Sequence, residues 1–478
     1  ATEVIILKHI YNFATKAELD LLHQASMRTL DEVGVMFFCQ DAVDIFKQHG
    51  FRTDGEKVFI SEKDVWEALK TCPKTFDWYG RKSHVTVGDG STICAPSYGP
   101  VFILENGDFH NVGQRDFVAL TKLCATSRVL QVSNPNALDY AFMDAKYASD
   151  WAQATVLMLD ERPMIGMVDG AKNARNSIKM AQEFYDIHDK VVVNGLISVA
   201  SPLHYSTAMC EALIEYSKAG QAMFITPSSL NGMTVPGSLA SLLMVNNAEV
   251  LAGVVLTQLI NPGTPVLYGI QSHGCDLRYA GPTIGSPEQC LIFSATKALG
   301  NYYGLPVRTG GSSCDAKDND MQAGVESFST MYATLQSGAD LMVHSCGSLD
   351  SDSTLSFDKF IYDEEILLSV QRILRGIEVS EETLMFDAVK EIGPFGSFLD
   401  LSDDLLEDST ELYRQDYLNL MIPSRMGHAA WIGAGRESVV QRTTRAYLKR
   451  LEEYQMPELE PARRAILEKY VPAELLKF

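Results

Sequence analysis

Short apolar runs rich in β-branched residues alternate with helical patterns from about residue 129 onward. The runs recur about every 35 residues, a spacing that predicts parallel strands joined by crossover helices. Seven such units in succession favour a closed TIM (β/α)₈ barrel over an open sheet. For the eighth strand the sequence leaves two candidates, the segment before residue 129 and the stretch near Gly376. The seven runs begin near Val129, Pro163, Val191, Ala222, Pro265, Pro306 and Asp340.

The segments on either side of this alternation have helical patterns. Thr15 and Glu18 fit a capping box, and Gly34 is placed to end the helix that follows. Further helices are expected at 41–49 and after Ser61. We therefore predict an N-terminal helical region at 1–85, a barrel at 86–375 and a C-terminal helical extension at 376–478.

Two local signals refine this division. Asn106-Gly107 between apolar runs predicts a β-hairpin just before the barrel alternation begins. Ser286, Pro287 and Gln289 together fit the start of a helix, with a cap, a proline in the first turn and an amide three residues on. The pattern at 436–454 predicts a long amphipathic helix that packs back on the body.

Charge and composition exclude several classes of protein. Lys plus Arg number 40 and Asp plus Glu number 61, giving a net charge of −21, so neither nucleic acid nor an anionic membrane surface is an expected partner. The 46% of hydrophobic residues is typical of a globular chain, without an uninterrupted apolar run of about 18 residues or a signal-peptide pattern. Nine cysteines, an odd number without C-x-x-C spacing, indicate reduced thiols in the cytoplasm and no metal site.

Portable catalytic motifs are absent from the sequence. There is no P-loop, no G-x-G-x-x-G after a strand, no H-E-x-x-H and no G-x-S-x-G. The chemistry must then come from residues that follow the barrel strands, because barrel active sites lie at the carboxyl ends of strands. These residues include Asn134, Asn136, Tyr140, Asp169, Ser198, His204, Tyr205, Thr226, Ser228, Gln271, His273, Ser312, Ser313, Asp315 and His344, with Tyr98 just after the predicted barrel entry.

This set is aromatic and neutral-polar, with Arg278 and Arg308 the nearest cations. A phosphate substrate would require more positive charge, so sugar-phosphate chemistry is disfavoured. Aromatic faces with few cations suit a cationic guest, because each ring attracts a quaternary ammonium by about 0.5–2 kcal/mol.

The middle of the chain resembles a known enzyme family. The segment SSLNGMTVPGSLASLLMVNNAEVLAGVVLTQLINPGTPVLYG is similar to the trimethylamine methyltransferase family of corrinoid-dependent enzymes. APSYGPVFILENG and SCDAKDNDMQAGVESFSTMYATLQSGADLMVHSCGSLDSDSTLSFDKFIYDEEI resemble the same family, and the resemblance covers about residues 15–380.

The resemblance implies a TIM barrel, a separate small corrinoid-binding (cobalamin-type) partner protein and methyl transfer from a methylated amine to Co(I). Archaeal trimethylamine enzymes of the family carry pyrrolysine, whereas this sequence contains only the twenty standard residues. Members without pyrrolysine resemble demethylases of quaternary amines such as glycine betaine, proline betaine, carnitine or γ-butyrobetaine. A quaternary nitrogen can leave as a neutral tertiary amine without a proton, so no general acid is required and no catalytic residue is firmly assigned.

On this basis we assign roles to the strand-end residues. Tyr98, Tyr140, Tyr205, Tyr268 and Phe357 are candidates for an aromatic cage around the ammonium. His344, with Gln271 or His273, is the candidate partner of a substrate carboxylate. Asp315 and Glu326 either face the corrinoid or order a loop.

Several alternatives remain open. The methyl donor could be trimethylamine or another methylamine, or the chain could be a barrel protein that binds a betaine without catalysis. An unrelated barrel lyase would need a Schiff-base lysine or a metal cluster at strand ends, and neither is evident. The oligomeric state is also left open by the sequence, with a homodimer as one possibility, because barrels with helical extensions often pair.

Overall fold

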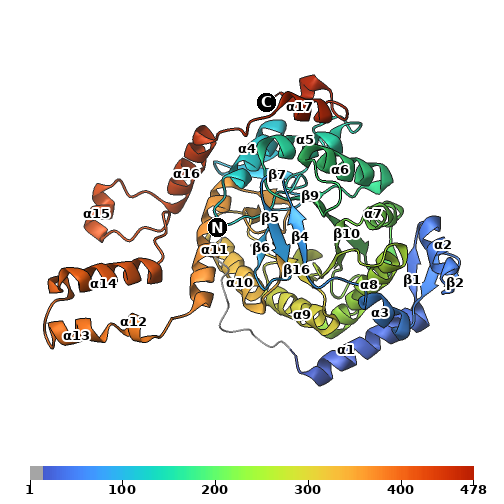
Figure 1. Cartoon of the computed structure of the whole chain (residues 1–478), viewed down its shortest axis with the longest axis horizontal. Helices are drawn as coiled ribbons and strands as arrows, with labels where there is room; N and C mark the ends of the chain where they lie inside the picture. Colours follow the sequence, from blue (N-terminus) through green and yellow to red (C-terminus); the bar gives the residue numbers. More distant parts are fainter. Residues whose placement is uncertain (1–13, 478) are drawn as a thin grey trace.

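The computed structural model describes residues 14–477 and has a mixed α/β fold centred on parallel strands (Figure 1). Hydrogen bonds join these strands in the order β9, β10, β12, β13, β16, β17 and β6. Every predicted run after the first contains one of them. Their bounds are β6 (Ile93–Cys94), β9 (Met164–Gly166), β10 (Val193–Ala200), β12 (Ala222–Ser228), β13 (Val266–Gly269), β16 (Val307–Gly310) and β17 (Leu341–Val343).

Residues 131–133 lie between the two ends of this series. The Gln131 N–H donates to the Cys94 carbonyl (3.0 Å), and the Ser133 N–H donates to the Pro163 carbonyl (2.8 Å). The predicted strand at 129 is therefore reduced to a bridge, because Pro135 has no N–H with which to continue the ladder. Gly376 ends a helix, so β6 is the additional strand and the stretch near Gly376 is not.

Helices α4 to α11 surround the strands in a ring (Figure 1). Strand and helix alternate along most of this region, as the spacing of apolar runs predicted. The helices are α4 (Gln114–Ala125), α5 (Ala148–Leu159), α6 (Gly170–Tyr185), α7 (Thr207–Lys218), α8 (Leu239–Ile260), α9 (Pro287–Tyr303), α10 (Met321–Ser337) and α11 (Phe357–Arg375).

Side chains on the strands divide by alternation into an inner and an outer set. The inner set forms one buried cluster with Trp78 and Val87, which come from the hairpin β4 (Phe76–Tyr79) and β5 (His84–Val87). The outer set packs against the helices in the main core. Inner residues include Ile93, Ile165, Ala222, Phe224, Leu267, Leu341 and Val343.

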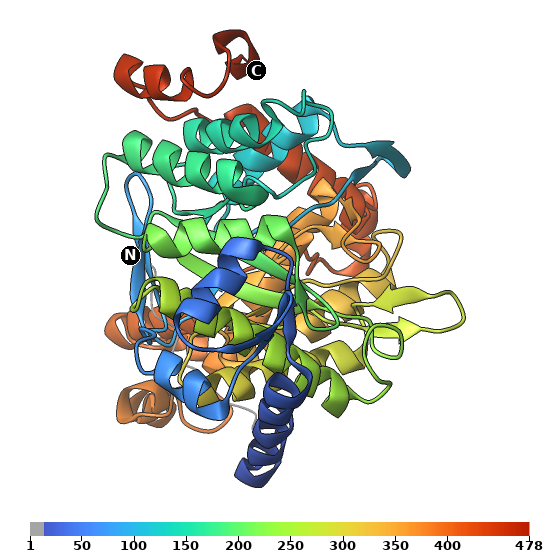
Figure 2. The same ribbon diagram turned by 90° about the vertical axis from the view of Figure 1, so that its right-hand side faces the viewer.

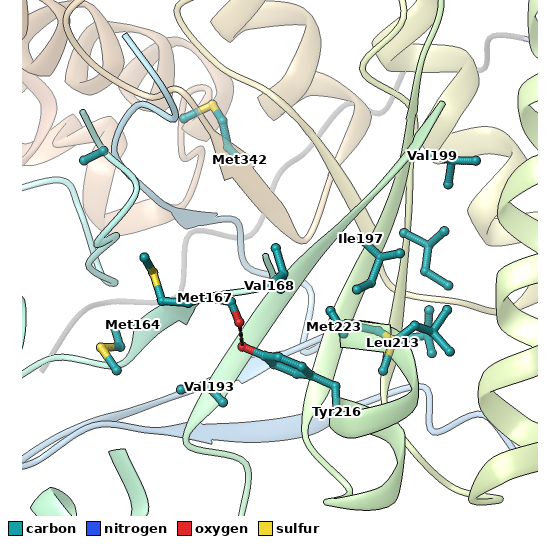
Figure 3. Close-up of a cluster of buried hydrophobic side chains, with 14 of the residues drawn as sticks. Met164, Met167, Val168, Val193, Ile197, Val199, Leu213, Tyr216, Met223 and Met342 are labelled. Carbon is teal, nitrogen blue, oxygen red and sulfur yellow. Dashed lines mark hydrogen bonds between the residues drawn. The ribbon is translucent and has the colours of Figure 1, made fainter. Parts of the chain in front are cut away.

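Part of the outer core lies between β9, β10 and α7 (Figure 3). The Tyr216 hydroxyl donates to the Met167 carbonyl (3.0 Å), and the ring lies beside two glycines that are register partners, Gly166 and Gly195. A Cβ on Gly195 would come within 2.8 Å of the Tyr216 ring. Glycine at these positions leaves the space that the tyrosine occupies.

The N-terminal region is less helical than predicted. The capping box of α1 (Lys16–Arg28) is confirmed, and a π-helical turn carries the chain to Gly34, whose φ is +80°. The helical pattern did not reveal three short strands, of which β1 precedes α2 while β2 and β3 lie between α2 and α3. Strand β1 pairs in parallel with β11. The elements are α2 (Gln40–Gln48), α3 (Glu62–Leu69), β1 (Val35–Phe37), β2 (Arg52–Asp54), β3 (Lys57–Phe59) and β11 (His204–Tyr205).

The hairpin at Asn106-Gly107 is confirmed as β7 (Phe102–Glu105) and β8 (Asp108–Asn111). Both turn residues have positive φ, +54° and +84°, as a tight hairpin turn of this sequence requires. Strand β7 also pairs with β19 (Thr354–Leu355), which pairs with β18 (Ser348–Leu349). This small sheet lies next to the chain that follows β17.

Helix α8 is long and apolar enough to cross a membrane by length and composition, but 78% of its most apolar window is buried inside the protein. Helices α1, α2 and α3 cover it. The Ser26 hydroxyl donates to the Met244 carbonyl (2.9 Å), and Thr71 donates to Gln258 (3.0 Å). Helix α8 is thus a core helix that the N-terminal region shields.

The chain after residue 375 is helical. Helix α16 (Val439–Glu453) is the predicted amphipathic helix, and it packs on α11 and α4. Arg450 pairs with the buried Glu364 (2.5 Å). In Figure 1 the four helices between α11 and α16, which are α12 to α15, project away from the parallel strands. The remaining helices are α12 (Glu381–Leu384), α13 (Phe386–Ile392), α14 (Asp403–Asp416), α15 (His428–Gly433) and α17 (Pro461–Leu467).

Candidate functional site

A buried arginine occupies the inside of the parallel strands near their carboxyl ends. Its strand neighbours Val307 and Thr309 face the helices, so Arg308 points to the opposite, inner side. Arg308 is 2% exposed, and one guanidinium N–H donates to the Gln271 side-chain oxygen at 2.5 Å. Burial lowers the pKa of Arg308 to about 10, which still leaves a cation at neutral pH.

His344 directly follows β17 in a strained conformation. Its φ is +62°, and its backbone is fixed by hydrogen bonds to Pro96 and Ser312. Such outliers cluster at functional sites. Burial lowers the pKa of His344, so the imidazole is neutral at neutral pH.

The nearest carboxylate to His344 belongs to Asp352. His344 Nδ1 lies 3.5 Å from Asp352 Oδ2 without a hydrogen bond between them. Asp350, Ser351 and Asp352 all have positive φ in the turn between β18 and β19. The turn therefore directs an acidic side chain towards the strand ends.

His273 is held by a residue that the sequence analysis assigned to helix capping. His273 Nδ1 lies 2.9 Å from the Gln289 side-chain oxygen, and burial lowers the pKa of this histidine. Ser286 makes no side-chain cap of α9, so the capping prediction is wrong in this detail while the helix start is confirmed. Gln289 instead fixes the orientation of a strand-end histidine.

Tyr98 and Tyr140 lie further out and are half-buried. Tyr98 packs against the inner cluster that contains Phe224. Burial, together with Tyr140, raises the pKa of Tyr98 far above its usual value, and burial raises that of Tyr140 to about 12. Both rings are therefore neutral phenols. The exposed Asp169 lies close enough to raise both pKa values further.

Three of the predicted cage residues lie elsewhere. Tyr205 stacks on Phe37 (4.9 Å between ring centroids), and Tyr268 donates to Asn247 of α8 (2.9 Å). Phe357 is at the start of α11, with its ring 5.6 Å from that of Tyr447. Alternation along β13 turns Tyr268 towards the helices. Of the five rings, Tyr98 lies close enough to Arg308 for their charges to interact, and Tyr140 lies near Tyr98 while it packs against the outer core.

Asp315 and Glu326 are engaged in loop contacts. The Asp315 carboxylate accepts from the Ile284 and Gly285 N–H groups and from the Ser351 hydroxyl (2.7–3.0 Å). The Glu326 carboxylate accepts from the Asp315 N–H (2.7 Å). These bonds connect the loop before α9, the loop after β16 and the turn that carries Asp352.

Sequence reasoning singled out Gln271, His273, His344, Tyr98 and Tyr140, and the structure brings these together. It missed Arg308 as a site residue, together with Asp352 and Gln289. Arg308 had a readable signal, because a charged residue in the middle of an apolar strand must be paired when buried. Asp352 had none, since its position depends on the fold of a turn.

Comparison with known proteins places the chain in a family. The family model described as Trimethylamine methyltransferase (MTTB) matches residues 4–474. A proline betaine:corrinoid methyltransferase of Eubacterium limosum is 34% identical over 97% of both chains. A glycine betaine methyltransferase of Desulfitobacterium hafniense is 30% identical over 96% of both.

Among solved structures, the monomethylamine methyltransferase of Methanosarcina barkeri has a similar fold. Its TM-score is 0.55 at 12% identity, covering 94% of this chain and 90% of that one. The family match over nearly the whole length and the two relatives decide the assignment. The chain belongs to the trimethylamine methyltransferase (MTTB) family.

Proposed function

We propose that this chain is a methyltransferase that takes a methyl group from a quaternary amine of the betaine type and delivers it to a reduced corrinoid. The observation that carries the proposal is 30–34% sequence identity, over nearly the full length of both chains, to relatives named for proline betaine and glycine betaine. The site supports it, since the neutral ring of Tyr98 lies near a buried arginine at the strand ends and has the neutral ring of Tyr140 near it.

The chemistry required of the protein is modest. The C–N bond breaks, its electron pair stays on nitrogen, and the amine leaves as a neutral tertiary amine while the methyl carbon bonds to cobalt. No proton is needed, which agrees with a site whose histidines are kept neutral by burial. Charge is lost on the way to the transition state, so a dry surrounding favours the reaction.

The protein then acts mainly by positioning. Rings at Tyr98 and Tyr140 would hold the ammonium by about 0.5–2 kcal/mol each. Fixing the N–CH₃ bond in line with the acceptor removes much of the entropic part of the barrier. The neutral phenols favour a cation without adding a charge of their own.

We infer that the strands form a closed (β/α)₈ barrel. The hydrogen bonds of residues 131–133 to Cys94 on one side and Pro163 on the other support closure. We propose the division into 1–85, 86–375 and 376–478. The end of α11 at Arg375 supports the second boundary, whereas strand β5 (His84–Val87) crosses the first.

The methyl acceptor is proposed to be a corrinoid on a separate small protein that approaches the strand ends. Asp315 and Glu326 would order the loops on that face, which their hydrogen bonds to three segments support. A homodimer and a cytoplasmic location remain predictions. Nine free cysteines agree with a reducing compartment.

The direct test mixes the protein with cob(I)alamin and a panel of glycine betaine, proline betaine, carnitine, γ-butyrobetaine and trimethylamine. We expect methylcobalamin to form, seen in the absorption spectrum, together with the demethylated tertiary amine from at least one betaine. Methylation by trimethylamine alone would favour the methylamine alternative. A thermal shift with a betaine but no methylcobalamin would favour a binding protein without catalysis.

A further inference from the structure

No carboxylate in the described part of the chain forms an ion pair with Arg308, although Asp352 lies close enough to raise the pKa of its guanidinium. By contrast, the buried Lys359 is paired with Asp363 (2.7 Å), and the half-buried Lys297 is paired with Asp340 (2.6 Å). Within residues 14–477 no carboxylate oxygen lies within 4.0 Å of the Arg308 guanidinium. A buried charge without a partner is costly, so its persistence points to a ligand that supplies the opposite charge.

The surrounding donors fit an anion. Arg308 Nε has no hydrogen-bond partner, and neither has Nε2 of Gln271, whose side-chain oxygen already accepts from Arg308. Gly310 leaves room for Gln271, because a Cβ there would lie 3.2 Å from both polar atoms of the amide. A guanidinium fork with an adjacent amide N–H₂ matches the acceptor-only geometry of a carboxylate.

The side chains of the site differ in how deeply they are buried. Arg308 is 2% exposed, Gln271 is 9% exposed, and Tyr98 and Tyr140 lie nearer the surface. Arg308 stands above Phe224, with its Cζ 5.9 Å from the ring centroid. An anion at Arg308 would therefore lie deep among the strands, and Tyr98, which is close enough to Arg308 to interact with its charge, lies towards the surface.

We propose that Arg308, with the amide of Gln271, binds the carboxylate of the substrate and thereby selects zwitterionic betaines over amines without a carboxylate. The proposal rests on the proposed function for the identity of the substrate. Trimethylamine or choline would leave the buried arginine unpaired and bring a second positive charge close to it. The carboxylate enters first, and the N-methyl groups remain towards the open end of the strands.

The anchor is tested with probes that carry a carboxylate but no ammonium and no transferable methyl. These are 3,3-dimethylbutyrate and 5,5-dimethylhexanoate, the carbon isosteres of glycine betaine and γ-butyrobetaine. We expect at least one to bind the wild-type protein in calorimetry and its affinity to fall at least about 100-fold in Arg308→Gln. Arg115→Gln changes an exposed arginine on α4 and should bind the probe as the wild type does.

A second variant keeps the test valid if Arg308→Gln does not fold. Gln271→Glu places a carboxylate beside the guanidinium with almost no change of shape. It should fold with an equal or higher Tm and still lose the probe, because the new carboxylate occupies the arginine. A folded Gln271→Glu or Arg308→Gln that binds the carboxylate probes as tightly as the wild type would overturn the proposal.

Turnover separates the anchor from the proposed function. With cob(I)alamin we expect Arg308→Gln to lose at least about 100-fold in kcat/KM for the preferred betaine, with no loss for tetramethylammonium. A merely structural role would lower both. If the wild type binds the probes through Arg308 but demethylates no betaine, the function is wrong and the anchor stands. Equal kcat/KM for the betaine in the folded variant removes the anchor and leaves the function.

Discussion

At the scale of single residues, strand alternation decides which predicted side chains meet. Tyr268 was chosen as a cage candidate although it lies inside a predicted strand, and its position in β13 turns it outward to Asn247. Arg308 has the opposite alternation on β16 and was the residue to choose. The sequence shows that a tyrosine and an arginine lie in these strands. It does not show which side of each strand faces inward, because that depends on how the strands come together.

Tyr98 should act through its ring and not through its hydroxyl. We expect Tyr98→Ala to lower kcat/KM for the preferred betaine by about 10-fold, since one cation–π contact contributes about 0.5–2 kcal/mol. Tyr98→Phe should stay within about twofold of the wild type. Tyr268→Phe is the control, because it removes only a hydrogen bond in the core and should change Tm without changing KM. An unchanged kcat/KM in folded Tyr98→Ala would exclude this ring from the cage.

Glu249 on α8 should give the stability of the protein a distinctive dependence on pH. Burial raises the pKa of its carboxyl from the ordinary 4.5 to about 7, although Leu203, Asn246 and Ser201 donate to it. Between these two values the folded chain holds a proton that the unfolded chain has lost. The contribution of Glu249 to the free energy of unfolding therefore falls as pH rises from about 4.5 to 7, by up to about 3 kcal/mol.

The measurement compares urea unfolding of the wild type and Glu249→Gln at pH 5 and pH 7.5. The variant loses a hydrogen bond at both values but cannot titrate at this position, so the wild type should weaken relative to it at the higher pH. Glu453→Gln on the exposed face of α16 serves as the control. A constant difference between wild type and Glu249→Gln at the two pH values would contradict the expectation.

At the scale of elements, local sequence signals correctly predicted several helix starts, one hairpin and most of the parallel strands. Capping at Thr15 and Ser61, the hairpin at Asn106-Gly107 and the later apolar runs are confirmed because each depends on neighbouring residues. Strands β1 to β3 were missed because β1 pairs with β11, about 170 residues away, and β3 and β2 join the sheet only through β1. Gln289 was misread since a helix-start amide and a side chain that holds His273 look identical in sequence.

The contact between α7 and the strands should tolerate no extra atom. Gly195→Ala would press a methyl group against Tyr216 and Val168, each 2.8 Å from the new Cβ. We expect the free energy of unfolding to fall by about 1–3 kcal/mol, measured in urea. Gly324→Ala adds the same atom on α10 where nothing lies within 4 Å, and it should stabilise by up to about 1 kcal/mol. Equal effects of the two substitutions would mean that the tyrosine can move aside.

At the scale of the whole molecule, buried charge ties the C-terminal segment to the body. Glu364 of α11 is buried, and it accepts from Ser127 (2.6 Å) and pairs with Arg450 of α16 (2.5 Å). The amphipathic pattern of α16 predicted that this helix packs back, but not against which helix. The closing contacts depend on α4 and α11 being neighbours, which only the finished fold provides.

Removal of this tie should be costly. Arg450→Met leaves the buried Glu364 with one partner, and we expect a loss of about 3–5 kcal/mol in the free energy of unfolding. Arg445→Met on the same helix breaks an exposed pair with Glu437 and should leave the free energy of unfolding almost unchanged, because solvent screens exposed pairs. Chemical denaturation of the two variants gives the comparison. Similar small losses in both would show that α16 is held by its apolar face alone.

The shielding of α8 by α1, α2 and α3 has a consequence for biosynthesis. A ribosome completes the three covering helices about 170 residues before it reaches the start of the long apolar helix, so the shield is made before the surface that it protects. Synthesis in this order lets α8 dock as it appears, instead of waiting unprotected beside other nascent chains. A shortened chain that begins after α3 would expose the outer face of the 22-residue apolar helix α8. We expect that chain to be bound by chaperones or to accumulate in inclusion bodies.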